Sequence, residues 1–170
     1  MQEKNDAKKD EFLTAFEDYS DALFRFAYFR VNNRDKAMDL VQTVFLKTWN
    51  YLSKGNEVIN LRPFLYTTLR NLIIDHYREK KYSSLDKIQE EEGWDPPADQ
   101  YGNAEIASDA ERAYALIKVL PLEYGQVIMM RLDGNSFKEI AEVFGESENT
   151  VTVRYHRGLK KLKDIFENGK

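Results

Sequence analysis

The chain has 170 residues, 13% of them aromatic, and a formal net charge of −4 at pH 7. It contains no cysteine and two histidines, which excludes disulfides and thiolate metal sites and leaves too few ligands for a zinc cluster. The polar N-terminus lacks a signal segment, and no run approaches the roughly 18 apolar residues of a membrane span, so we expect a soluble cytoplasmic protein without membrane insertion.

Two amphipathic helices are predicted at the start of the chain. Apolar residues recur at helical spacing over residues 11–31, and a second pattern covers residues 35–52. The outer face of this second helix sets a leucine among polar groups beside a tryptophan, which indicates a protein-contact surface. Isolated exposed apolar residues are the alternative. The candidate contacts are Asp39, Gln42, Leu46 and Trp49.

A third helix is predicted from about Pro63 to about Lys81, because proline suits a first helical turn. Its outer face interleaves rings with basic groups, as a single-strand surface does when rings stack on bases and cations follow the backbone. The polar loop 53–60 before it suits a pocket for an extruded base. An ordinary helix with tyrosines at the domain rim is the alternative. The candidate contacts are Arg62, Tyr66, Arg70, Asn71, Ile74, Tyr77, Arg78 and Lys81.

Residues 83–108 have the composition of a linker, with many acidic residues, two adjacent prolines and scattered glycines. We expect an all-α protein in which this linker joins a domain at 10–82 to a domain at 109–168. Basic segments lie on both sides of the acidic one, and local charge rather than the net sum governs contact with phosphates. The linker is expected either to stay mobile or to cover basic surfaces of the free protein.

The C-terminal domain contains the pattern of a helix-turn-helix. Ser136 and Glu139 have the spacing of a capping box, and Gly145 ends the short helix that this box begins. Ser147 or Asn149 then caps a second helix, which gives the layout of the DNA-binding motif.

One face of this second helix is polar and basic with a small apolar residue, which suits a major groove. Arginine pairs with guanine, asparagine with adenine, and valine contacts a thymine methyl group. A solvated basic helix in a small bundle is the alternative. The candidate duplex contacts, with phosphate-contacting residues at the edges, are Asn149, Thr152, Val153, Arg154, His156, Arg157, Lys160 and Lys161.

Three stretches together resemble the extracytoplasmic-function sigma factors of bacterial RNA polymerase. AMDLVQTVFLKTW (37–49) resembles their polymerase-clamp helix, and LRPFLYTTLRNLIIDHYREKK (61–81) resembles their segment for the minus-ten promoter element. LPLEYGQVIMMRL and SFKEIAEVFGESENTVTVRYHRGLKKL, within 120–162, resemble their minus-thirty-five reader. The three stretches follow the order of the family and span both expected domains.

The resemblance implies a mechanism and partners. The chain would bind core RNA polymerase at the β′ clamp, chiefly through Asp39, Gln42 and their neighbours, and at the β flap. The N-terminal domain would capture the non-template strand, and the C-terminal helix would enter the upstream major groove. Arg70, Asn71 and Arg78 match motif positions by type, as does Asp75, for which a local orienting or capping role is the alternative. An anti-sigma factor is a further expected partner.

Four residues depart from the pattern of the family. Thr43 stands where a glutamate usually follows the clamp-helix glutamine, and Glu146 stands at an apolar position of the turn. Thr152 and Val153 stand where lysine and serine are frequent. These differences concern the polymerase contact and the promoter sequence rather than the class of protein.

Two other classes of function would make different demands on the sequence. A helix-turn-helix regulator with a sensing N-terminal half would bind duplex DNA alone, often as a dimer, and would need no polymerase. An enzyme would need a phosphate loop, a metal-ligand spacing or a nucleophile with its base, and the sequence contains none of these. We therefore expect no enzymatic activity, no catalytic residue, no metal and no cofactor.

Overall fold

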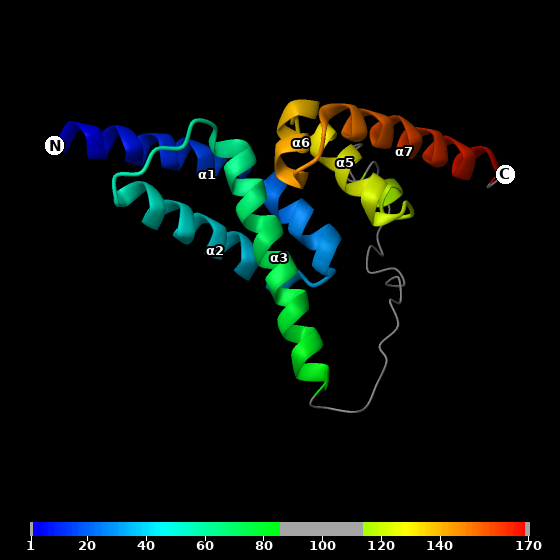
Figure 1. The fold of residues 1–170 in the computed structure, drawn as a ribbon, viewed down its shortest axis with the longest axis horizontal. Coiled ribbons are helices and arrows are strands. Elements are labelled where there is room, and N and C mark those ends of the chain that lie inside the picture. The colour runs from blue at the N-terminus through cyan, green and yellow to red at the C-terminus, as the bar shows by residue number, and fades with distance from the viewer. Residues whose placement is uncertain (1, 86–113, 169–170) are drawn as a thin grey trace, which may run out of the picture.

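The computed structural model describes residues 2–85 and 114–168, and every regular element in these ranges is helical (Figure 1). This confirms the predicted all-α class. The predicted linker falls mainly on residues 86–113, which lie outside the described part. No helix of the described residues is long and apolar enough to cross a membrane. The elements are α1 (Gln2–Val31), α2 (Arg34–Ser53), α3 (Leu61–Leu85), α5 (Leu122–Leu132), α6 (Phe137–Phe144) and α7 (Glu148–Asn168).

The N-terminal domain is formed by α1, α2 and α3, which pack on one another around a buried apolar core. Asn32 adopts a left-handed φ of 49°, and the Asn33 side chain accepts a hydrogen bond from the Lys36 backbone N–H at 2.9 Å. This turn and cap end α1 and begin α2. The helices are longer than expected, since α1 begins at Gln2 and α3 continues to Leu85.

The helix-turn-helix of the C-terminal domain is confirmed. Ser136 and Glu139 form the complete capping box of α6, and Gly145 ends α6 at a left-handed φ of 65°. Ser147 accepts a hydrogen bond from the backbone N–H of Thr150 and so caps α7. The α7 helix packs on α5 across Gly158, whose missing Cβ would approach the Ile128 Cδ1 atom to 2.9 Å.

The two domains pack against each other. In Figure 1, α6 lies beside the N-terminal half of α3, while α7 extends away from the N-terminal domain. Helix α5 contacts α1, and α6 contacts α3. Buried apolar residues of both domains form one continuous cluster. This arrangement divides the predicted nucleic-acid surfaces into covered and exposed parts.

Candidate polymerase and nucleic-acid surfaces

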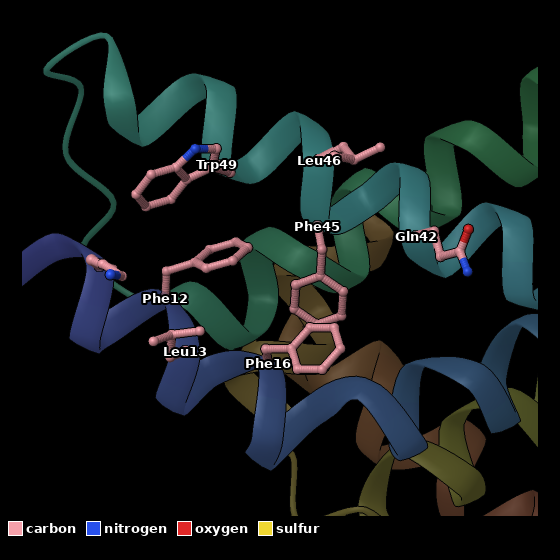
Figure 2. Close-up of a pocket in the computed structure, with 8 residues that line it drawn as sticks. Phe12, Leu13, Phe16, Gln42, Phe45, Leu46 and Trp49 are labelled. Atoms are coloured by element: carbon pink, nitrogen blue, oxygen red, sulfur yellow. The ribbon is translucent and has the colours of Figure 1, made fainter.

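An apolar groove of about 520 Å³ runs between α1 and α2 (Figure 2). Gln42, Leu46 and Trp49 line it from α2, where three of the four predicted polymerase contacts therefore come together. Asp39 is exposed on the same helix and does not line the groove. Leu46 is 65% exposed, far more than a core leucine, so no other described residue buries this face of α2.

The other wall of the groove was not predicted from the sequence. Phe12, Leu13 and Phe16 of α1 face α2, and the Phe16 ring lies 4.8 Å from the Phe45 ring, centroid to centroid. Leu13 and Phe16 are both about half exposed. Their recurrence three and four residues apart was a usable signal, but the same spacing also marks a core stripe.

Thr43 is satisfied within α2. Its hydroxyl donates to the Asp39 carbonyl at 2.8 Å, one helical turn earlier. The threonine that replaces the usual glutamate therefore removes a charge from this surface and leaves the helix intact, since a hydroxyl bonded to the preceding turn is compatible with helical geometry.

The predicted single-strand face of α3 is split along the helix. Tyr77 and Arg78 are exposed on the C-terminal half, Asn71 is exposed near the middle of the helix, and the Tyr77 hydroxyl donates to the Arg30 carbonyl at 2.6 Å. Ile74 is half-buried and Lys81 is exposed. The remaining three members, Arg62, Tyr66 and Arg70, face the C-terminal domain.

The predicted outward orientation of Tyr66 is wrong in this arrangement. Its ring is 1% exposed and packs edge-to-face on Phe26 of α1 at 5.4 Å. Burial raises the pKa of Tyr66, and the charge of the nearby Asp133 adds to the increase. An angular test on a single helix cannot find this burial, because the covering residues come from α1 and from the C-terminal domain.

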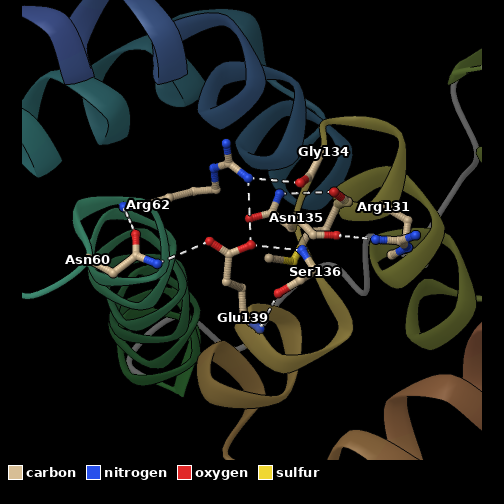
Figure 3. A network of polar contacts seen from close by, with 8 residues as sticks. Asn60, Arg62, Arg131, Gly134, Asn135, Ser136 and Glu139 are labelled. Atoms are coloured by element: carbon tan, nitrogen blue, oxygen red, sulfur yellow. Dashed lines mark hydrogen bonds and ion pairs between the residues drawn. The ribbon is translucent and has the colours of Figure 1, made fainter.

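Arg62 lies at the centre of a polar network between the domains (Figure 3). Its guanidinium donates to the Gly134 carbonyl at 2.8 Å and lies 3.5 Å from the Glu139 carboxylate. The Asn60 amide donates to the other Glu139 oxygen at 3.2 Å, and the Ser136 backbone N–H donates to Glu139 at 2.7 Å. Burial opposes ionisation of Glu139, but these hydrogen bonds and the Arg62 charge outweigh it, so its pKa is lowered.

Most of the predicted duplex-contacting face of α7 is exposed in the described part of the chain. Asn149, Val153, His156, Arg157 and Lys160 are exposed, whereas Val151 is fully buried against the domain core. Thr152 is half-buried, and its hydroxyl donates to the Glu148 carbonyl. Lys161 is exposed, with its ammonium 5.6 Å from the Tyr124 ring centroid. The predicted basic face is therefore brought together, with Arg154 as its exception.

Arg154 is held by the turn rather than presented to solvent. Both of its terminal nitrogens lie 2.9 Å from the two carboxylate oxygens of Glu146. This is a bidentate pair, the geometry that arginine and carboxylate favour. The side chain of Arg154 is 19% exposed. Glu146, which departs from the family pattern, therefore forms an ion pair with Arg154, one of the predicted duplex contacts.

Comparison with known proteins identifies the two domains separately. The family model for Sigma-70 region 2 matches residues 15–82, and the model for Sigma-70, region 4 matches residues 110–162. The chain is 31% identical to the RNA polymerase sigma factor SigZ of Bacillus subtilis, over 81% of this chain and 77% of that protein. It is 26% identical to the RNA polymerase sigma factor YlaC of the same organism, over 91% of each chain.

Two solved structures share the fold. The sigma factor RpoE of Bartonella quintana, in complex with the anti-sigma factor NepR, matches with a TM-score of 0.68 at 25% identity, over 92% of this chain and 97% of that one. CnrH, in complex with the cytosolic domain of CnrY, matches in fold with a TM-score of 0.65 at 19% identity, over 99% of this chain and 96% of that one. The chain belongs to the extracytoplasmic-function sigma factors, the small sigma factors of bacterial RNA polymerase, and it supports promoter-directed initiation of transcription.

Proposed function

We propose that the chain binds core RNA polymerase, holds the melted minus-ten element with its N-terminal domain and reads the minus-thirty-five element with α7. The observation that carries the proposal is the outward face of α7, where Arg157 and Lys160 are exposed. The preceding helix α6 begins with a complete capping box and ends in a left-handed turn, as in a helix-turn-helix. Basic and amide groups on such a helix match the donor and acceptor pattern of a major groove.

The α1–α2 groove supports the polymerase contact. An exposed leucine beside a tryptophan, with apolar residues on the facing wall, has the composition of an interface centre, where a partner side chain excludes water. We assign this groove to the β′ clamp and leave the β flap to the C-terminal domain. The protein acts without catalytic residues of its own in this proposal, and the polymerase supplies the chemistry.

An anti-sigma factor belongs to the same proposal. The solved relatives that support it are described as complexes with the anti-sigma factor NepR and with the cytosolic domain of CnrY. An inhibitor that covers the α1–α2 groove would exclude the polymerase from it, so competition between the two partners is expected.

Run-off transcription with purified core polymerase tests the function. We expect promoter-specific transcripts that require this chain and disappear with Arg157→Ala. A simple helix-turn-helix regulator would instead shift duplex DNA and leave the activity of core polymerase unchanged. That outcome would overturn the sigma-factor assignment of the surfaces.

The groove has its own test. Leu46→Ala should weaken the affinity for core polymerase by about tenfold or more, since truncation of an interface anchor costs about 2 kcal/mol or more and about 1.4 kcal/mol corresponds to tenfold. Met38→Ala is the matched control, because Met38 is also an exposed apolar residue of α2 but lies outside the groove. Equal effects of the two substitutions would remove the groove from the polymerase interface. Asp39→Arg should weaken the same binding without unfolding the chain.

A further inference from the structure

The C-terminal domain covers the N-terminal half of the α3 face that is proposed to hold the promoter strand. Arg62 contacts Gly134 and Glu139, and the Arg70 guanidinium lies 5.7 Å from the Phe144 ring centroid. Tyr66 between them is buried. The C-terminal half of the same face is exposed, so the covering is confined to the part that α6 contacts.

The covering groups have the chemistry of a nucleic-acid strand. The Glu139 carboxylate offers two anionic oxygens to Asn60 and Arg62, as a backbone phosphate would. The Phe144 ring offers its face to Arg70, as an unstacked base would. A carboxylate and an aromatic ring from the short helix α6 thus contact two arginines of α3, Arg62 and Arg70.

We propose that the segment 133–144, which ends α5 and forms α6, is an intramolecular stand-in for the promoter strand and competes with it for α3. This inference rests on the proposed strand-binding function of α3. We call the arrangement in which α6 contacts α3 and α5 contacts α1 the closed arrangement.

Contacts beside the mimicking groups stabilise the closed arrangement. Arg25 of α1 donates to the Asp133 carboxylate at 2.7 Å, and Asp133 is 2% exposed and also accepts from the Tyr114 hydroxyl. Arg30 donates to the Gln126 side chain at 2.9 Å. Removal of Arg25 would leave a buried carboxylate without its cation, which is strongly unfavourable unless the domains separate and water enters.

Gly125 permits the close approach of α5 to α1. A Cβ atom at this position would lie 2.5 Å from the Phe29 Cζ atom, inside contact distance. Alanine is also a better helix former than glycine. Because the Phe29 ring of α1 must shift to admit the added atom, Gly125→Ala disturbs the contact between α5 and α1 while it favours the helix in which it stands.

The closed arrangement is incompatible with simultaneous use of both DNA surfaces. The minus-ten and minus-thirty-five promoter elements lie about 25 base pairs apart. At 3.4 Å per base pair this is roughly 85 Å of B-DNA. Helix α6, which belongs to the minus-thirty-five reader, touches α3, which is assigned to the minus-ten strand. The domains must therefore separate when the strand is captured.

A distance measurement tests the inference on the full chain. Because the chain has no cysteine, Lys47→Cys and Asp164→Cys, both at exposed positions, place one fluorescent label on each domain. We expect a short distance in the free protein and a longer one with Gly125→Ala, Arg25→Ala or Glu139→Gln. Glutamine preserves the capping box but removes the charge that Arg62 meets. An unchanged distance in all three variants would overturn the closed arrangement.

Binding of a short, labelled single-stranded deoxyoligonucleotide of mixed sequence tests the competition. A chain that is closed nine times out of ten binds about tenfold more weakly than an open one, so the three variants should bind about tenfold more tightly. By linkage, the oligonucleotide should lengthen the distance in the unmodified chain. Equal, measurable affinity of closed and opened chains would overturn the competition but leave strand binding intact. No binding by any chain, opened variants included, would instead refute the strand-binding function itself.

Matched controls separate the inference from general charge effects. Glu142→Gln makes the same charge change at an exposed position of α6, and the Glu142 carboxylate forms no hydrogen bond or ion pair with the described residues of α3. Arg34→Ala removes a cation whose ring contact, with Phe24, lies within the N-terminal domain. Both should leave the distance unchanged, and helicity by circular dichroism should show that every variant is folded. A control that opens the chain as far as Glu139→Gln would overturn the assignment of Glu139.

Discussion

Single charges decide what the recognition helix can offer to DNA. Arg157 is exposed and forms no ion pair in the described part of the chain, whereas Arg154 is bound by Glu146 through two contacts of 2.9 Å. Of these two arginines, only three residues apart, Arg157 can therefore reach DNA directly, whereas Arg154 must first leave Glu146. The sequence shows the acidic residue in the turn, but only the folded chain shows which arginine it reaches.

Glu146→Gln should release Arg154 toward phosphates. We expect tighter binding to duplex DNA of any sequence, and a slope of log K against log salt that is steeper by about 0.9, the value for one more neutralised phosphate. Affinity measured over a range of salt concentrations checks this. If binding instead weakens at a single promoter position, Glu146 holds Arg154 for base reading, and our interpretation is wrong.

Arg157→Ala should cost about 1–3 kcal/mol of binding free energy at one base pair of the upstream element. The reason is that a bidentate pair with guanine is lost while the phosphate contacts remain. Binding to a panel of duplexes with single base-pair changes measures the effect. An equal loss on every duplex would identify Arg157 as a phosphate contact.

Helix packing sets the position of α7 relative to the rest of its domain. Gly158 lies where α7 crosses α5, and an added Cβ would meet the Ile128 side chain at 2.9 Å and the Tyr124 Cβ at 3.0 Å. The sequence places Gly158 on the apolar face of α7, but it does not show that the facing atoms on α5 include a Cβ atom, that of Tyr124, which is fixed to the backbone. The close crossing follows from the absence of a side chain.

Gly158→Ala should lower the free energy of unfolding of the C-terminal domain by about 1–3 kcal/mol, because overpacking outweighs the gain in helix propensity. Urea denaturation followed by circular dichroism measures the change. Asp164→Ala, at an exposed position of the same helix, should stay within about 0.5 kcal/mol of the unmodified chain. A Gly158 variant as stable as this control would show that α5 and α7 adjust freely.

At the scale of the molecule, local signals in the sequence were sufficient for the elements but not for their assembly. The capping box at Ser136, the stop at Gly145 and the cap at Asn33 each depend on a few neighbouring residues, and all three are present. The contact of Arg62 with Glu139 joins residues 77 positions apart, and no periodicity predicts it. The same limit explains Tyr66, because its position on α3 was found by angle and its burial depends on a second domain. The exposure of Arg157 and Lys160 on α7 could be predicted because it depends on the pattern of this one helix, and no other described segment buries them.

The closed arrangement should weaken as the pH falls through the acid range. Glu139 faces Arg62 from α3 and Asn60 from the preceding loop, and its pKa is lowered there. The bond from the Ser136 N–H belongs to the capping box of α6 and does not depend on closure, whereas the contacts with Asn60 and Arg62 do, and these two make the ionised carboxylate favour closure. Its contribution is therefore fully present above the ordinary glutamate pKa of about 4.3 and is lost as the pH falls through the lowered value.

The distance between labels on the two domains, followed from neutral to acid pH, measures this loss. Lowering the pH also changes the charge of other groups, so the informative quantity is the difference between the unmodified chain and Glu139→Gln. Glutamine cannot ionise, and we expect the variant to be more open at neutral pH and the two chains to converge as Glu139 becomes protonated. If the difference between them stays constant across the acid range, the charge of Glu139 does not hold the domains together, and the contact with Arg62 follows from closure instead of causing it.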